Sequence, residues 1–381
     1  MRRVIISTVG TSLLTNQINR ANPDEKNWYS QLRDTANLSN ELIQKTHPEV
    51  LEIIQTLENR ALSNLSQSQV DKIRASSAEL NGIYAIYQEQ LAQGSQDIHW
   101  LIATDTAQGK ATAEIVETFL KAQSLSNVNT YVPPGLSTAS TSSFSDGIDN
   151  LIAWMQENIP PYKKSGYKIC LNLVGSFKSL QGYLNTIGMF YADEIIYIFE
   201  GQKSELITIP RLPIAVDMQV ISPYKTQLAL MDAGASVSVN DAQGIPEALV
   251  YILEDEMTLS NWGKLVWGEC KLDLLAQELL TFPRLQYQPS FVKDYQQVKD
   301  KHERMDLQET LAKVSHLLIE SKGNISVLKQ DGGLLYSKLE NTDDVDRFRI
   351  TQKLRISCKA VEGNLVLRRY GNHDYGNEQC P

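Results

Sequence analysis

Cysteine is scarce in this sequence of 381 residues, and its four cysteines, Cys170, Cys270, Cys358 and Cys380, lie far apart. Their spacing fits neither a disulfide framework nor the paired ligands of a metal site. Long apolar runs are absent too: none approaches the roughly 18 to 20 residues that a membrane span needs, and the chain leads straight into a strand-like run instead of a signal peptide. The sequence therefore predicts a protein of the reducing cytoplasm that has no membrane contact.

Two common nucleotide-binding motifs are also missing. The chain contains neither G-x-x-x-x-G-K-[ST] nor G-x-G-x-x-G, so NTP hydrolysis and nicotinamide binding are poorly supported. Histidine is scarce as well, and four of the five histidines lie apart from cysteine or carboxylate clusters at ligand spacing. We expect structural roles for these four and no bound metal; they are His47, His99, His302 and His316.

Positive charge is outnumbered, with 36 Lys and Arg against 45 Asp and Glu, a net charge of −9. This balance argues against a surface that binds nucleic acid all over. The charge is uneven, however, because residues 347–381 carry seven basic and three acidic side chains. A local basic site near the C-terminal end is therefore compatible with the composition.

At 42% hydrophobic and 21% charged residues, the chain can bury a core, and its length predicts two or three domains. Residues 1–215 alternate short apolar strands with helices, which indicates a Rossmann-like α/β domain whose parallel sheet is covered on both faces. Polar amphipathic helices are predicted between the first two strands, over residues 16–95. The predicted strands cover residues 4–9, 98–103, 128–132, 167–174 and 194–199, with 206–210 pairing near the last, and the later helices cover 111–122, 144–157 and 180–191.

The alternation stops after residue 215. Residues 216–284 are expected to form a helical connector, and residues 285–381 a small α+β domain. The connector helices are predicted at 246–259, where Pro246 suits a first helical position, and at 262–280, with a short wing at 235–239. The last domain is predicted to have a strand at 285–288, helices within 290–321, and strands at 333–338, 348–350, 354–360 and 365–370, the last two joined by a turn at 362–364.

Polar loops follow three strands of the first domain: residues 10–12, 104–106 and 175–179. In doubly wound sheets, ligands bind at the carboxyl edge of the strands, where loop N–H groups and helix N-termini face an anion. Gly, Ser and Thr are also ordinary turn and N-cap residues, so each loop alone favours that simpler interpretation. Three such loops on one edge favour a phosphate or nucleotide ligand, with Lys178 as the countercharge.

Residues 4–16 (VIISTVGTSLLTN) and 171–181 (LNLVGSFKSLQ) resemble the two signature segments of CARF domains, the cyclic-oligoadenylate sensors of type III CRISPR systems. The resemblance covers residues 1–215. It implies a homodimer whose two-fold axis passes through the bound ring, for which we expect the four-membered ring, and nothing is carried over to the helical insert. The residues that it places in the ligand site are Gly10, Thr11, Ser12, Asp105, Thr106, Gly175, Ser176, Phe177 and Lys178.

Residues 285–299 followed by 348–375 resemble the RelE/ParE toxin superfamily, whose basic groove takes mRNA in the ribosomal A site. The resemblance implies an endoribonuclease domain over residues 285–381 and no cofactor beyond the activating ring. The alignment leaves Lys353 as a rival to Arg355. The residues that it places at the catalytic site are Arg347, Arg349, Arg355, His373 and Tyr375.

Metal-free RNA scission needs a proton taken from the 2′-hydroxyl, stabilised charge on the phosphorane, and a proton given to the 5′-oxygen. Arginine cannot move protons at neutral pH and serves as an electrostatic clamp. His373 is the natural proton carrier, although a turn residue is its simpler interpretation, and Tyr375 can stack on a base or act as an acid. Of the adjacent Arg368 and Arg369, strand alternation allows only one to face the groove.

The sequence thus predicts a fusion of a CARF sensor and a RelE-like toxin: a metal-independent endoribonuclease, activated by cyclic oligoadenylate, that cleaves mRNA to arrest translation in antiviral defence. The expected partners are the ring, mRNA, the ribosome, with its stalk as a candidate contact, and a second copy of the chain. Two alternatives remain open. One is a ring nuclease that degrades its own ligand, with Ser12 and Lys178 at the reacting phosphate, and the other is a ligand-responsive regulator that binds nucleic acid.

Overall fold

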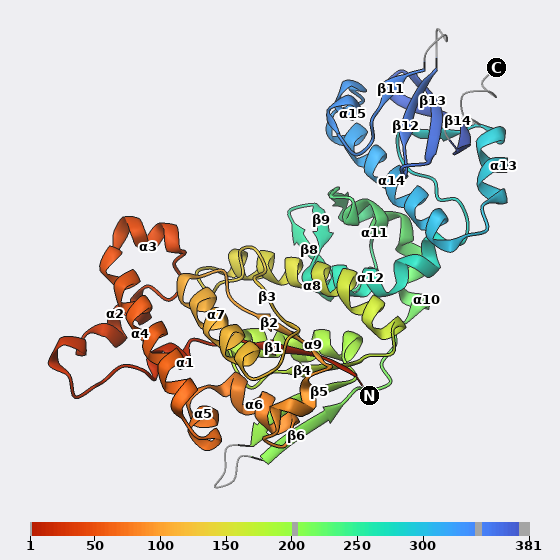
Figure 1. Cartoon of the computed structure of the whole chain (residues 1–381). Coiled ribbons are helices and arrows are strands. Elements are labelled where there is room, and N and C mark those ends of the chain that lie inside the picture. Colours follow the sequence, from red (N-terminus) through yellow and green to blue (C-terminus); the bar gives the residue numbers. More distant parts are fainter. Residues whose placement is uncertain (1, 200–204, 340–344, 373–381) are drawn as a thin grey trace. The chain divides into compact units, whose positions relative to one another are not determined.

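The computed structural model describes residues 2–199, 205–339 and 345–372, and the chain divides into two compact units, Met1–Ile214 and Ala215–Pro381 (Figure 1). Both units are mixtures of helices and strands. Within the described ranges, no helix combines the length and the apolar character that a bilayer crossing requires.

A six-stranded sheet in the order β3-β2-β1-β4-β5-β6 forms the centre of the first unit. Its first five strands are parallel, and β6 pairs antiparallel with β5 at one edge. This confirms the predicted Rossmann-like α/β fold. The strands are β1 (Arg3–Thr8), β2 (Ile98–Ile102), β3 (Val128–Tyr131), β4 (Lys168–Asn172), β5 (Glu194–Phe199) and β6 (Glu205–Pro210).

Helices cover both faces of this sheet, as its uninterrupted apolar strands predict. The β1 residues Val4 to Thr8 are all buried, and Ile5 packs on a cluster that includes Leu57 of α4 and Val116 of α7. On the other face, α8 contacts β4 and α9 contacts β5. The α-helices are α1 (Ser12–Thr15), α2 (Trp28–Asp34), α3 (Asn40–Thr46), α4 (Pro48–Gln67), α5 (Val70–Ser76), α6 (Ala78–Ile86), α7 (Ala107–Ala122), α8 (Thr141–Lys164) and α9 (Lys178–Tyr191).

The second unit contains a five-stranded sheet in the order β10-β14-β13-β12-β11 and a three-stranded sheet in the order β7-β9-β8. In the larger sheet, β10 and β14 are parallel and the other pairs are antiparallel. The strands are β7 (Val237–Ser238), β8 (Val250–Leu253), β9 (Glu256–Leu259), β10 (Leu285–Tyr287), β11 (Ser337–Lys338), β12 (Asp346–Arg349), β13 (Leu354–Val361) and β14 (Asn364–Asn372). The helices are α10 (Met218–Ile221), α11 (Lys225–Asp232), α12 (Asn261–Leu275), α13 (Pro289–Gln297), α14 (Lys301–Glu320) and α15 (Ser326–Gln330).

One hydrophobic core runs through the second unit. Trp267 and Phe282, from the predicted connector, belong to the same buried cluster as Phe291 and Phe348 from the predicted toxin domain. The apolar side chains on the two sides of residue 284 therefore fold together. The separate domains at 216–284 and 285–381 stay a prediction.

The helix expected at residues 246–259 is wrong. The segment Pro246 to Leu259 holds a short 3-10 turn followed by the β8–β9 hairpin, with Glu254 in the left-handed region at φ +56°. Two features favour this outcome. The β-branched and aromatic run that starts at Val250 suits a strand. In β9, the exposed Glu256 and Thr258 alternate with the buried Met257 and Leu259, a period of two.

The turn predicted at residues 362–364 is confirmed. Glu362 and Gly363 have φ of +48° and +75° between β13 and β14, the conformation that two-residue hairpin turns favour. The strand expected at residues 333–338 is shorter than predicted, since only Ser337–Lys338 pairs with β12. The preceding residues form a turn in which the Gly333 N–H donates to Asp331.

Candidate functional site

A pocket with a volume of about 540 Å³ lies at the carboxyl edge of the six-stranded sheet. The loops after β1, β2 and β4 contribute to its wall, and the neighbouring strands β1 and β4 are the point where the strand order reverses. Doubly wound sheets bind ligands at that point. We call this cavity the switch-edge pocket, and its wall includes Gly10, Thr11, Ser12, Tyr29, Arg33, Asn37, Ala78, Thr104, Thr106, Gln108, Thr138, Val174, Gly175, Ser176 and Phe177.

Hydrogen bonds from the sheet hold the loops in place. The Val9 N–H donates to the Ile102 carbonyl at 2.9 Å, and the Thr8 hydroxyl donates to the Gly175 carbonyl at 2.5 Å. A Cβ atom added to Gly10 would lie 3.0 Å from the Ser176 nitrogen. The loop after β1 thus approaches the loop after β4 backbone to backbone, which is the close approach that glycine permits.

Seven of the nine residues expected at the ligand site line the pocket, and Asp105 and Lys178 do not. The Asp105 carboxylate lies 2.7 Å from Lys110 Nζ and accepts the Gly135 N–H at 3.0 Å. Burial raises the pKa of Asp105, but these two partners outweigh it and leave the pKa below its ordinary value. Asp105 therefore joins α7 to the loop after β3, and Thr106 caps α7 by accepting the Gly109 N–H.

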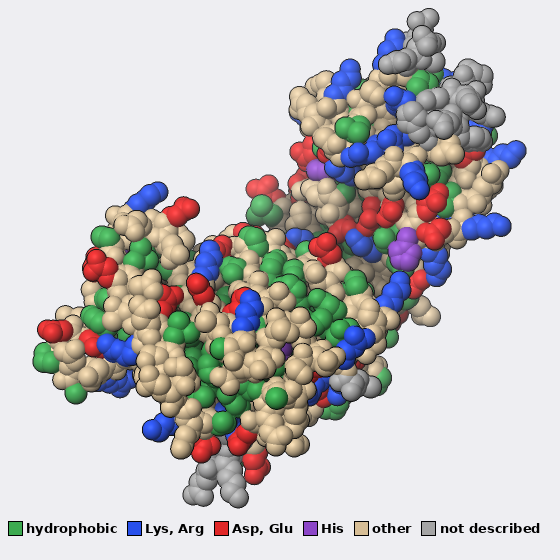
Figure 2. Space-filling view, viewed as in Figure 1, with side chains coloured by type: hydrophobic (Ala, Val, Ile, Leu, Met, Phe, Trp, Pro, Cys, Tyr) green, Lys and Arg blue, Asp and Glu red, His purple; other side chains and the backbone are tan. Residues whose placement is uncertain are grey.

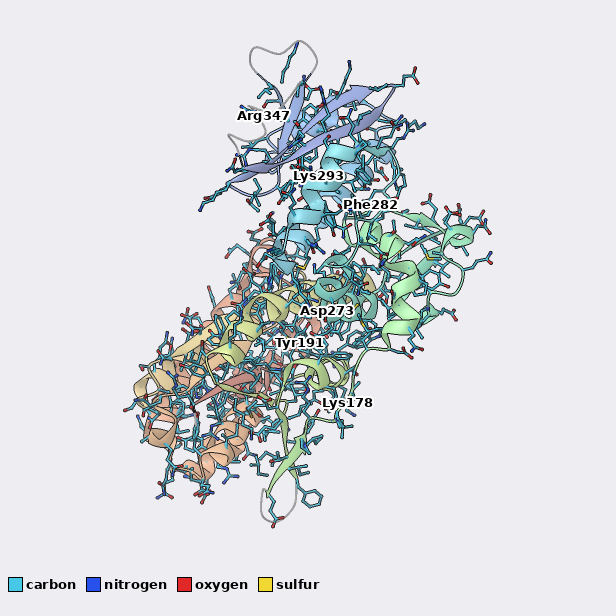
Figure 3. The ribbon with its side chains drawn as sticks, turned by 90° about the vertical axis from the view of Figure 1, so that its right-hand side faces the viewer. Lys178, Tyr191, Asp273, Phe282, Lys293 and Arg347 are labelled. Atoms are coloured by element: carbon cyan, nitrogen blue, oxygen red, sulfur yellow. The ribbon has the colours of Figure 1, made fainter. Side chains whose placement is uncertain are left out.

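Lys178 is the first residue of α9, and its side chain is exposed (Figure 3). It follows Phe177, which lines the pocket, so the lysine sits where a helix N-terminus already favours an anion. Ser176 precedes them with φ of +96°, and its buried hydroxyl has no hydrogen-bond partner among the described residues. Backbone strain of this kind concentrates at functional sites.

The helical insert contributes a wall that the sequence reasoning missed. Tyr29 and Arg33 of α2, together with Asn37, line the pocket. Tyr29 and Arg33 are four residues apart, so one helix face presents both, and that spacing is the signal that the sequence offered. Their position beside the loops depends on tertiary hydrogen bonds, which the sequence pattern does not reveal.

Glu79 lies directly behind the pocket loops. Its side chain is fully buried, and neither carboxylate oxygen has a hydrogen-bond partner among the described residues. A Cβ atom on Gly175 would lie 2.7 Å from Glu79 Oε2 and 2.8 Å from the Thr8 carbonyl, so the loop after β4 packs closely over the carboxyl group. Burial raises the pKa of Glu79 to about 7, despite weaker opposing effects of its own N–H, Ser77 and the Gly10 N–H.

The raised pKa of Glu79 predicts a stability that falls with pH. Between about pH 4.5 and pH 7 the folded chain keeps a proton that the unfolded chain has lost, so the free energy of unfolding should fall by on the order of 3 kcal/mol across this window. Glu79→Gln should remove that part of the fall. Urea unfolding of both proteins at pH 5 and pH 8 measures the change in the free energy of unfolding. The same change in both proteins would show that burial does not raise the pKa of Glu79.

In the second unit, Arg347, Arg349 and Arg355 lie on one face of the five-stranded sheet; we call them the arginine cluster. Arg349 pairs directly with Arg355 across β12 and β13. Arg347, labelled in Figure 3, lies two residues before Arg349 on the same strand, so both side chains point to one face. Phe348 and Ile356 face the opposite side and are fully buried. Partial burial lowers the pKa of Arg355, and the charges of Arg349 and Arg347 add to this effect.

Two of the three arginines are also held by backbone oxygens. Arg349 Nε donates to the Gly333 carbonyl at 3.0 Å, and Arg355 donates to the Thr351 carbonyl at 2.6 Å. Lys353, the rival of Arg355, lies in the β12–β13 turn and outside the paired strands. The structure therefore groups Arg355, and not Lys353, with the other two arginines.

The expectation that only one of Arg368 and Arg369 faces the groove assumes regular alternation of side chains along the strand. A register shift between β13 and β14 at Ser357/Cys358 interrupts this alternation. Arg369 forms an ion pair with Asp294 of α13 at 3.0 Å, so its guanidinium is engaged within the unit. His373 and Tyr375 lie outside the described residues, and their catalytic roles stay predictions.

Comparison with known families adds one finding. Residues 74–212 are similar to the family described as CRISPR-associated protein (Cas_APE2256). The match to this CRISPR-associated family includes the loops after β2 and β4, with Thr106 and Gly175. It leaves out β1 with its Gly10 loop, the insert residues Tyr29 to Asn37, and the whole second unit.

His99, which lies within the residues that match the family, has a structural role. Its ring is buried in β2, and Nε2 lies 3.0 Å from the Tyr87 hydroxyl. Burial lowers the pKa of His99 to about 4, which keeps the ring neutral. In the part of the chain that the structure describes, no group of three or more His, Cys, Asp or Glu side chains could hold a metal ion.

Proposed function

We propose that this chain is a cyclic-oligoadenylate sensor fused to a RelE-like toxin: a metal-independent endoribonuclease that cleaves mRNA, on the ribosome, when the ring is bound. The observation that carries the proposal is the switch-edge pocket, where three Gly/Ser/Thr loops meet at the reversal of the strand order. The similarity of residues 74–212 to a CRISPR-associated family supports the same setting, namely type III CRISPR defence.

The sensor part of the proposal rests on the chemistry of the pocket wall. Backbone N–H groups near Gly10 and Ser176, the hydroxyls of Thr11 and Ser12, and the N-terminus of α9 with Lys178 favour a phosphodiester. In the proposed homodimer, the two-fold axis passes through the ring and each copy supplies the same loops. The four-membered ring is the proposed ligand.

The effector part rests on the arginine cluster. Three arginines on one sheet face can bind successive RNA phosphates and stabilise the charge of the phosphorane. In the proposed reaction, the 2′-oxygen attacks the adjacent phosphorus, and the 5′-oxygen leaves and takes up a proton. His373 and Tyr375 are proposed for the proton transfers, since arginine does not carry protons at neutral pH.

The net charge of −9 bears on how the RNA arrives. Figure 2 shows acidic and basic side chains interspersed over the visible surface, without a basic coat. The attraction between this mixed-charge surface and free RNA would be weak, because contacts between basic side chains and phosphates supply most of the non-specific affinity of a protein for RNA. We therefore propose that the ribosome presents the mRNA, with its stalk as a candidate contact and the cytoplasm as the setting.

Two other functions can be separated from this one by their products. A ring nuclease would cut the ring alone, with Ser12 and Lys178 at the reacting phosphate, and a nucleic-acid-binding regulator would cut nothing. The test incubates the chain with labelled ring, ribosomes and a labelled mRNA, and analyses both labels. The proposal predicts cleaved mRNA that requires the ring. Cleaved ring with intact mRNA, or a salt-dependent gel shift with no cleavage, would contradict it.

A further inference from the structure

The helical insert is fastened to the edge of the sheet at the pocket. Gln108, at the start of α7, donates from Nε2 to the Leu32 carbonyl at 2.6 Å, and the Ala107 N–H donates to the Leu38 carbonyl at 2.9 Å. Leu32 is fully buried, and Gln108 is nearly so. The segment that carries Tyr29 and Arg33 therefore has a fixed position against the first turn of α7.

A third attachment orients Asn37. Its Oδ1 accepts hydrogen bonds from both the N–H and the hydroxyl of Thr138, at 3.3 Å and 2.5 Å. A backbone N–H can only donate, so this contact fixes which end of the Asn37 amide is the oxygen. With the oxygen engaged, the Asn37 side chain can serve a ligand only through Nδ2, as a donor.

Tyr29 presents an aromatic surface to the pocket. Its side chain lines the cavity and is 52% exposed, so the face of the ring is accessible to a ligand in the pocket. Base–aromatic stacking is a common use of such a ring in proteins that bind single-stranded nucleic acid. The ring can therefore serve as a platform for a base whose phosphate lies at the Gly10 and Ser176 loops.

Arg33 adds a cation on the same helix face. It pairs with the adjacent Asp34 at 2.8 Å, and the two side chains are 67% and 63% exposed. An ion pair so open to water contributes little to stability, so a phosphodiester can replace Asp34 at little cost. Arginine then offers its planar donors to the phosphate oxygens.

We propose that this insert wall of Tyr29, Arg33 and Asn37 binds one adenosine phosphate unit of the ring. Tyr29 stacks on the adenine, Asn37 Nδ2 donates to a ring nitrogen of the base, and Arg33 binds the phosphodiester. The wall thus recognises the base, while the glycine loops hold the backbone of the ring. The inference rests on the proposed function, because the ligand it completes is the cyclic oligoadenylate.

The test measures the affinity of the full-length chain for cyclic tetra-adenylate by calorimetry. For each copy of the chain that contacts the ring, Tyr29→Ala should weaken binding about fivefold to 150-fold, the range for loss of one stacked base, and Tyr29→Phe should bind as the unchanged protein does. Arg33→Ala should reduce the slope of log affinity against log salt by about one. Tyr251→Ala is the matched control, since that tyrosine is 51% exposed and lies in the second unit.

The outcomes separate this inference from the proposed function. If the unchanged chain binds the ring and Tyr29→Ala binds it as tightly as Tyr251→Ala does, the insert wall is overturned and the sensor assignment stands. If the unchanged chain binds no ring of three to six units, both are overturned. Thermal unfolding of each variant verifies that the fold is kept, as the exposure of Tyr29 and Arg33 predicts.

Discussion

Replacing Lys178 by alanine should weaken ring binding about 100-fold to 10,000-fold and remove activation at ring levels that saturate the unchanged protein. A charge-assisted hydrogen bond of this kind contributes about 1.5–3 kcal/mol, and a homodimer loses one on each side of the ring. The fold should be unaffected, because the side chain is exposed at the start of α9. Calorimetry with the four-membered ring and a ribosome cleavage assay measure the two effects.

Lys164→Ala is the matched control for this variant. Lys164 is also an exposed lysine of the first unit, and it ends α8, so it lies at the opposite end of the sheet from the pocket loops. We expect this control to bind the ring as the unchanged protein does. A Lys178→Ala protein that is activated at the same ring concentration as Lys164→Ala would show that the sensor site has been misplaced.

Loss of the arginine cluster should leave ring binding intact and slow RNA cleavage. Removing one preorganised electrostatic group from a transition state typically costs about 100-fold to 1000-fold in rate. We expect losses of this size for Arg347→Ala and Arg349→Ala, and the same for Arg355→Ala. Single-turnover cleavage of mRNA on ribosomes, with the ring present, measures the rate.

Arg355 needs a second measurement because its guanidinium also donates to the Thr351 carbonyl and so supports the β12–β13 turn. Thermal unfolding distinguishes a loosened turn from a lost phosphate contact. Lys329→Ala is the matched control, since Lys329 is exposed on α15, outside the sheet. If all three arginine variants cleave as fast as this control, the cluster has no part in the reaction.

The sequence was most informative where local chemistry decides the structure. The buried β-branched run at β1 and the Glu362-Gly363 turn each have one favoured backbone conformation, and each was predicted correctly. The carboxyl edge of a parallel sheet follows from the strand order, so the loops that contain Gly10 and Gly175 could be placed together before the structure was known.

Prediction failed where a residue type was compatible with two structures or where tertiary contacts decide. Pro246 fits the first turn of a helix, but here it precedes a hairpin whose apolar residues alternate. The sequence could not place Tyr29 and Arg33 beside the pocket, because their position depends on hydrogen bonds from Gln108 and Ala107 of α7 to the insert. Glu79 lies within the helices predicted at residues 16–95, and only its burial behind Gly175 reveals its raised pKa.

We propose that ring binding in the first unit controls RNA cleavage by the second. This proposal is tested most directly by the rate of mRNA cleavage on ribosomes, measured with the full-length chain at increasing concentrations of cyclic tetra-adenylate. We predict a low rate without the ring and a rise that saturates at the concentration where the binding curve saturates. A cleavage rate that does not depend on any ring of three to six units, or no cleavage at saturating ring, would contradict the account.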